Sequence, residues 1–199
     1  DAWLAKQKDR KMVTLGAGVT GVTSDRDLTS EMALRVDRVR RHLDRAELAI
    51  EEKAVLATAA GHKKAKEAIG EGVTERQVQI ALENEMMLYG AHEIGYGTIV
   101  GAGDHAAVLH FEPSNRVIDQ DDLVLVDAGG AVLGYTADVT RTYPAGNAFT
   151  PKQQAIYDIV HQAELEGIAQ CHVGVEWHDI HRVAAKVIAE GLCDLGILK

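Results

Sequence analysis

The sequence has little positive charge and no long apolar run, and each shortage excludes a class of protein. Its 21 lysines and arginines stand against 30 aspartates and glutamates, for a net charge of -9. Nucleic-acid binding calls for basic patches, so this balance disfavours a nucleic-acid partner. No apolar run could cross a bilayer, and the polar opening DAWLAKQKDRK does not resemble a signal peptide. We therefore expect a cytoplasmic protein that binds neither nucleic acid nor membrane.

Cysteine is also scarce. The two cysteines, Cys171 and Cys193, lie near the end of the sequence and do not form the CxxC spacing of metal sites. We expect two buried, reduced thiols rather than a disulfide. Hydrophobic residues make up 46% of the 199 positions, which is enough for the core of one globular domain.

Three predicted helices begin at a recognisable N-terminal cap. In each, an N-cap residue is followed three positions later by an acid or amide that completes a capping box. The three pairs are Asp44 with Glu47, Thr74 with Gln77, and Thr150 with Gln153. Pro151 strengthens the third start, because proline suits the first position of a helix.

Short apolar stretches rich in glycine and β-branched residues occupy positions 94–142. They predict a series of antiparallel strands. The stretches are IGYGTIVGAG, AAVLHFE, DLVLVDAG and GYTADVTRT. Residues 1–30 show little periodicity and are predicted to be a linker or the tail of a preceding segment.

One segment of the sequence is repeated. GVTERQVQIALENEM (residues 72–86) and GVEWHDIHRVAAKVI (residues 174–188) superpose without a gap, and each follows a predicted helix. The match predicts a duplicated unit whose second copy ends at Lys199 before its strands. We therefore expect one and a half copies of a two-copy domain. The helix face with Ile180, Val183 and Val187 would then lack a sheet and be exposed, and residues 1–199 alone would aggregate, self-associate or recruit the missing part from another chain.

Two acids interrupt the apolar strand residues in VLVDAGGAVLGYTADVTRTYP. A hairpin with its turn at Val132 and Leu133 would place Asp127 directly opposite Asp138. Opposed carboxylates repel each other unless a positive charge lies between them, and a hard divalent cation suits carboxylate oxygens. The alternative is two acids at solvent-facing strand ends.

These motifs carry a family resemblance. VDAGG…GYTADVTRTYP, preceded by GYGTIVGAGDHAAVLHF and followed by FTPKQQAIYDIV, resembles the pita-bread metallopeptidases. Within that family it is most similar to the Xaa-Pro aminopeptidases (aminopeptidase P) and to prolidase. The resemblance covers residues 36–199 and is most specific over 94–160. It implies a pita-bread fold of two pseudo-equivalent α+β halves, of which residues 31–199 form a partial catalytic domain. It also implies that residues 1–30 are the exit linker of an N-terminal domain.

The resemblance also implies a set of site residues. Asp127 and Asp138 correspond to two of five ligands for two divalent ions, usually manganese, with cobalt or zinc as alternatives. The other ligands, a histidine and two glutamates, are expected beyond Lys199. His110 corresponds to a histidine that donates to the developing oxyanion, and Tyr96 to a tyrosine that lines the site.

The implied activity is hydrolysis of the bond between an N-terminal residue and proline in peptides. Two alternatives remain open: a prolidase that accepts only dipeptides, and a non-catalytic pita-bread module that binds a protein. A homo-oligomer, a dimer in the first instance, is expected. With only two of five ligands, residues 1–199 alone are expected to bind metal weakly and to lack peptidase activity.

Overall fold

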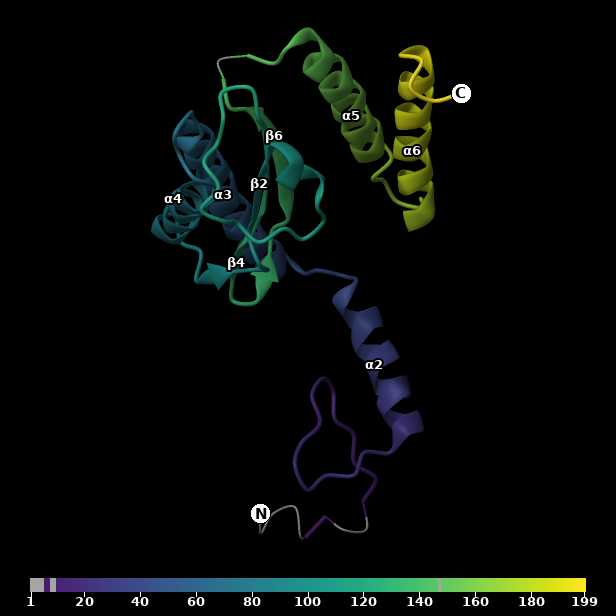
Figure 1. Cartoon of the computed structure of the whole chain (residues 1–199). Helices are drawn as coiled ribbons and strands as arrows, with labels where there is room; N and C mark the ends of the chain where they lie inside the picture. The colour runs from purple at the N-terminus through teal and green to yellow at the C-terminus, as the bar shows by residue number, and fades with distance from the viewer. Residues whose placement is uncertain (1–5, 8–9, 147) are drawn as a thin grey trace.

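The computed structural model describes residues 6–7, 10–146 and 148–199 (Figure 1). The α3 and α4 helices cover a set of short strands, α5 and α6 form a pair beside this body, and α2 extends away from it (Figure 1). The helices are α2 (Arg26–Arg40), α3 (Arg45–Ala68), α4 (Glu75–Leu88), α5 (Pro151–Ala169) and α6 (Trp177–Asp194). Among the described residues, no helix is both long and apolar enough to cross a membrane.

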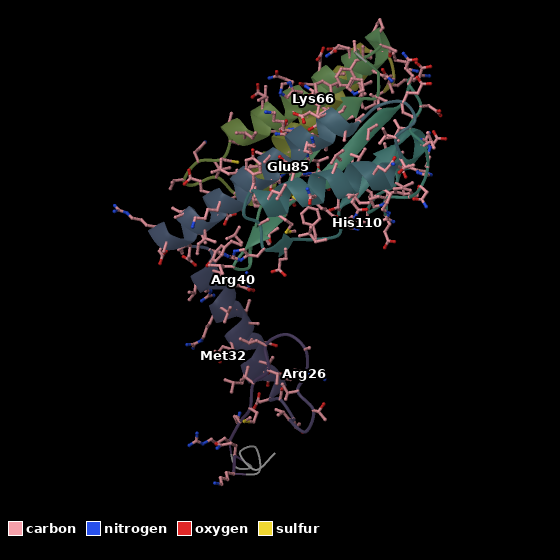
Figure 2. The ribbon with its side chains drawn as sticks, turned by 90° about the vertical axis from the view of Figure 1, so that its left-hand side faces the viewer. Arg26, Met32, Arg40, Lys66, Glu85 and His110 are labelled. Atoms are coloured by element: carbon pink, nitrogen blue, oxygen red, sulfur yellow. The ribbon has the colours of Figure 1, made fainter. Side chains whose placement is uncertain are left out.

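The three predicted helix starts are confirmed. Capping boxes are complete at Asp44, Thr74 and Thr150, which cap α3, α4 and α5. The α2 helix was not predicted. Its N-cap is Asp25, whose side chain accepts a hydrogen bond from the Leu28 amide at 3.0 Å, and none of its residues is buried. Arg26, Met32 and Arg40 mark its course away from the body (Figure 2).

Within the described part of the chain, six strands form two small antiparallel sheets, ordered β1-β4-β5 and β2-β3-β6. Their bounds are β1 (Glu93–Ile94), β2 (Ile99–Ala102), β3 (Leu123–Ala128), β4 (Gly130–Val132), β5 (Tyr135–Thr136) and β6 (Val139–Pro144). The strand predicted for AAVLHFE is wrong. A short 3₁₀ helix, η1 (Gly103–Ala107), and a turn occupy this stretch, and the Val108 amide donates locally to the His105 carbonyl at 3.1 Å.

The register of the central hairpin differs from the prediction by two residues. Val132 pairs with Tyr135, so the turn residues are Leu133 and Gly134, with φ of 52° and 83°. Two positive φ angles match the tight turn that suits twisted hairpins, and glycine adopts one of them without strain. The predicted direct pairing of Asp127 with Asp138 is therefore wrong: Asp127 faces Thr140.

The core lies between the α3–α4 pair and the strands. Its fully buried side chains include Val78, Leu82, Met86, Val100, Ile118, Val124 and Val126. The two helices approach closely at Gly61, where a Cβ atom would lie 2.5 Å from the Met86 Cγ and 3.0 Å from the Leu82 carbonyl oxygen. The α3 helix also packs on β4 and β5, which lie between the two acids in the sequence.

The α5 and α6 helices make their main contact with each other. The face of α6 that carries Ile180, Val183 and Val187 was expected to be exposed. It is half-buried, because α6 packs on α5. Nevertheless, no residue of α6 is buried. The expectation of buried thiols is wrong, since Cys171 and Cys193 are both exposed at this pair of helices.

Candidate metal centre

A bulge before β2 directs one aromatic side chain towards the hairpin. The Gly95 amide donates to the Gly129 carbonyl at 2.8 Å, whereas Ile99 already pairs with Asp127. Residues 96–98 therefore lie opposite Ala128 alone. Extra residues on one strand opposite a single residue of its partner form a bulge. The bulge brings Tyr96 to the two acids.

The Tyr96 hydroxyl lies between the carboxylates. Its oxygen is 2.5 Å from the Asp127 Oδ1 and 2.9 Å from the Asp138 Oδ1. A phenol has one proton to donate, so the two carboxylates share a single donor. Asp127 lies in β3 and Asp138 directly precedes β6, and together with Tyr96 they draw three segments of the chain into one site. The structure thus brings together three of the four residues predicted for the site.

The environment keeps Tyr96 neutral. Burial raises the pKa of the Tyr96 hydroxyl, and the hydrogen bonds to Asp127 and Asp138 raise this pKa further, because a phenolate would repel both carboxylates. Tyr96 therefore remains a hydrogen-bond donor throughout the physiological pH range. As a neutral donor it holds the two carboxylates close together without cancelling their charge.

The backbone next to the acids has no room for a side chain. A Cβ atom at Gly129 would collide with the Ala137 carbonyl and lie 3.1 Å from the Tyr96 Cε1. Glycine at position 129 therefore lets the strands approach beside Tyr96.

Buried groups of α3 support this part of the hairpin from behind. The Thr58 hydroxyl accepts from the Gly130 amide at 2.9 Å, and His62 Nε2 lies 3.3 Å from the Ala128 carbonyl. Burial lowers the pKa of the His62 imidazole, so the ring is neutral and Nε2 carries the proton that it donates. Asp127 is thus held in a strand whose next carbonyl is bonded to the helix below.

The donor set suits a hard divalent cation as part of a larger ligand set. Two carboxylates that face a common point supply the oxygen ligands that Mg²⁺, Mn²⁺ and similar ions prefer. No group of three or more potential His, Cys, Asp or Glu ligands is assembled within the described part of the chain. Asp127 and Asp138 therefore fit a metal site that needs further ligands.

His110 lies apart from this arrangement. It occupies the turn that follows η1, with a φ of 53°, and its side chain is exposed (Figure 2). Within the described residues, no hydrogen bond joins His110 to Tyr96, Asp127 or Asp138. The structure therefore gathers the two predicted metal ligands and the tyrosine, but it does not link His110 to them.

Two features were missed by the sequence reasoning. A groove of about 620 Å³ separates β6 from α5, and Asp138 lies on its wall with Val139, Thr140, Ile156, Tyr157 and Val160. The second feature is a fully buried carboxylate, Glu75, which is hydrogen-bonded to His105. The groove had no sequence signal. Glu75 had none either, because it lies inside a capping-box motif, where an acid is ordinary.

The sequence is similar to a known peptidase family and to its members. The model of metallopeptidase family M24 matches residues 50–197. A probable Xaa-Pro aminopeptidase of Fusarium vanettenii is 34% identical over 164 residues, which are 82% of this chain and 35% of that protein.

The solved structures that the chain resembles include aminopeptidases P. Proline aminopeptidase P II from Yersinia pestis superposes with a TM-score of 0.78 at 33% identity, over 89% of this chain and 39% of that one. Zinc-substituted aminopeptidase P of Escherichia coli in complex with product superposes with a TM-score of 0.76 at 32% identity, over 79% and 36%. The chain thus spans little more than a third of the length of the relatives that it matches.

Proposed function

This chain belongs to metallopeptidase family M24 and has its pita-bread fold, and from this membership we propose that it forms part of a metal-dependent Xaa-Pro aminopeptidase. The proposed reaction is hydrolysis of the bond between an N-terminal residue and proline. The observation that carries the proposal is the pair of carboxylates, Asp127 and Asp138, that share the Tyr96 hydroxyl.

Asp127 and Asp138 are the residues that would hold the divalent metal, as two members of a larger ligand set. The ions, when bound, would supply the Lewis acidity that makes water nucleophilic at neutral pH. Manganese is the proposed metal, and the zinc-substituted Escherichia coli relative supports a divalent ion at such a site. We propose that the remaining ligands lie in the part of the relatives' length that the chain does not span.

The other residues have roles in binding and proton donation. Tyr96 would orient the two carboxylates and line the substrate site, since its proton is fixed on the hydroxyl. His110 has an exposed ring, and we propose that it donates a hydrogen bond to the substrate carbonyl oxygen as negative charge develops there. This role requires the turn after η1 to hold His110 beside the bound peptide.

A peptidase assay with paired aspartate variants tests the proposal. The longest polypeptide that contains residues 1–199 would be incubated with Mn²⁺ and tripeptides that have proline second. We expect release of the first residue, and loss of both release and Mn²⁺ binding in Asp127→Asn and Asp138→Asn. The matched control is Asp121→Asn, since Asp121 is an exposed aspartate that precedes β3.

Three outcomes would contradict the proposal or narrow it. Cleavage of dipeptides alone would replace it with a prolidase. A well-folded protein that binds no metal and releases no residue would replace it with a non-catalytic binding module. Activity that survives both aspartate substitutions would show that the metal ligands are elsewhere.

We also propose that residues 1–30 link this domain to an N-terminal domain and that the protein is a homodimer. No residue of α6 is buried, so the apolar residues of the α5–α6 pair retain exposed surface that a second copy could cover. The solution mass, measured by light scattering over a range of concentrations, tests the dimer. A strictly monomeric mass at every concentration would overturn it.

A further inference from the structure

Glu75, the first residue of α4, is an ionisable side chain with no exposed surface. A buried carboxylate is costly unless hydrogen-bond donors surround it. The Glu75 carboxylate has four such donors. Oε1 accepts from the Ala102 amide at 2.9 Å and lies 2.8 Å from His105 Nδ1, and Oε2 accepts from the Ser114 amide at 3.1 Å and hydroxyl at 2.6 Å. This buried acid is thus fully satisfied.

The donors flank one segment of the chain. Ala102 ends β2 and His105 lies in η1, whereas Ser114 follows the turn that carries His110. One oxygen of Glu75 therefore holds the beginning of the segment 103–113, and the other oxygen holds its end. Few other described hydrogen bonds restrain the segment, because it does not pair with a strand.

A stacking contact extends this clamp to the neighbour of His110. The His105 ring lies against the Phe111 ring, with centroids 4.2 Å apart. Since Nδ1 of His105 is bonded to Glu75, the orientation of the imidazole is set by the buried carboxylate. Glu75 thereby restrains Phe111 through His105, and Phe111 is covalently linked to His110.

The charge of the carboxylate is retained. Burial by itself raises the pKa of Glu75, but the hydrogen bonds from Ser114, Ala102 and His105 outweigh burial and hold the pKa below its ordinary value. Glu75 is therefore ionised at neutral pH and accepts all four bonds. An ion pair between Arg116 Nη1 and Asp122 Oδ2, at 2.7 Å, stiffens the chain just beyond Ser114.

We propose that Glu75 is a positioning residue for His110: its buried carboxylate clamps both ends of segment 103–113 and, through His105 and Phe111, determines where the His110 ring lies. The proposal rests on the proposed function only for the role of His110. The clamp itself is a statement about the order of this segment and can be tested without catalysis.

The first test is amide hydrogen exchange in the Glu75→Gln variant, followed by mass spectrometry of peptides that cover 103–113. Glutamine has the same shape, but its NH₂ group must face donors on one side of the clamp. We expect exchange in this segment to be roughly tenfold faster or more, because hydrogen bonds to a charged group are among the strongest in proteins. Exchange in β3 and β6 should be unchanged. Glu71→Gln, at an exposed acid just before α4, is the matched control.

A pair of substitutions at Ser114 separates the clamp from general destabilisation. Ser114→Ala removes the hydroxyl bond to Glu75, whereas Ser114→Thr keeps a hydroxyl donor. We expect faster exchange of 103–113 in Ser114→Ala and near-normal exchange in Ser114→Thr. Equal protection of the segment in wild type, Glu75→Gln and Ser114→Ala would overturn the clamp. Faster exchange throughout the molecule in Glu75→Gln, without the Ser114 contrast, would do the same.

The second test uses the Xaa-Pro peptidase assay in the same polypeptide. If Glu75 positions His110, Glu75→Gln should lower kcat about tenfold or more while KM and Mn²⁺ binding change little. A variant with faster exchange in 103–113 but wild-type kcat would show that the clamp does not position a catalytic group. If the wild type is inactive, the proposed function fails, while the exchange result still decides whether the clamp exists.

Discussion

The α3–α4 and α5–α6 helix pairs have the same helix–turn–helix arrangement, but they differ in what covers them. At the offset of the sequence repeat, the first residue of α4, Glu75, corresponds to the first residue of α6, Trp177. A glycine with positive φ precedes each helix, Gly72 at 84° and Gly174 at 93°. The structure therefore supports the predicted duplication at the level of helices and turns.

The two pairs also share buried positions where their helices cross. The buried residues of α5 are Ala163 and Gly167, and at the same offset they correspond to Gly61 and Ala65, which are buried in α3. Small residues at both positions let the two helices of each pair cross closely.

The two pairs differ where α3 meets the strands. Ala54, Thr58 and His62 of α3 are buried against the hairpin, whereas the corresponding α5 residues, Ile156, Val160 and Glu164, line the open groove beside β6. An amphipathic sequence is thus enough to pair two helices, but deep burial requires a sheet.

The largest expected effect is that of truncating equivalent residues at the two helix crossings. Met86 is fully buried in the first pair, and its counterpart Ile188 is half-buried in the second. We expect Met86→Ala to lower the free energy of unfolding by about 2–5 kcal/mol, and Ile188→Ala by less than about 1.5 kcal/mol. Urea titrations followed by circular dichroism would measure both. Equal losses would show that the second pair is as well packed as the first.

Adding a methyl group at the crossings should have opposite effects in the two pairs. Gly61→Ala would press on the Leu82 backbone, and overpacking of this kind costs about 1–3 kcal/mol. At Gly167 a Cβ atom would lie 3.7 Å from the Ile180 Cγ2, an ordinary contact. Gly167→Ala should therefore raise stability by up to about 1 kcal/mol through helix propensity. Thermal unfolding of the two variants gives the signs, and a loss in both would contradict the difference in packing.

The helix caps offer a smaller contrast. Thr74 caps α4 through a complete capping box, whereas its counterpart Glu176 makes no side-chain cap bond to α6. Thr74→Ala should cost about 1 kcal/mol, and Glu176→Ser should add up to about 1 kcal/mol. The measurement is the same urea titration. Stabilisation by Glu176→Ser should be seen as slower amide exchange in the first turn of α6, and unchanged exchange there would count against a new cap.

The smallest expected effect is a pH dependence that belongs to the first pair. Burial lowers the pKa of folded His62, so the unfolded chain takes up this proton first as the pH falls through about 6.5. The stability contribution of neutral His62 is complete above that pH and declines below it. His62→Gln should make the free energy of unfolding less sensitive to pH between about 7 and 5. His172→Gln, at an exposed histidine, is the control and should leave the slope unchanged.

Local signals in the sequence predicted where α3, α4 and α5 begin, and they identified the two acids. The capping boxes at Asp44, Thr74 and Thr150 depend on residues three positions apart, and all three formed. The strand alternation also placed Asp127 and Asp138 on the same side of the hairpin, because a register error of two residues leaves each side chain on its face.

The errors occurred where distant segments compete with local preferences. AAVLHFE has the composition of a strand, yet it forms the end of a 3₁₀ helix and a turn, and Glu75 of the distant α4 helix bonds to both ends of its segment. The α2 helix was missed because its sequence is strongly polar, and none of its residues is buried in the structure.

By itself the sequence determined where α3, α4 and α5 begin, that a helix pair is repeated, and that two acids lie in one hairpin. These features depend on neighbours along the chain, where capping bonds and strand alternation act over a few residues. Only the tertiary structure decided that Tyr96 reaches both acids and that Glu75 clamps the loop of His110. Both depend on contacts between residues more than twenty-five positions apart, and such contacts form only when distant segments of the chain pack together.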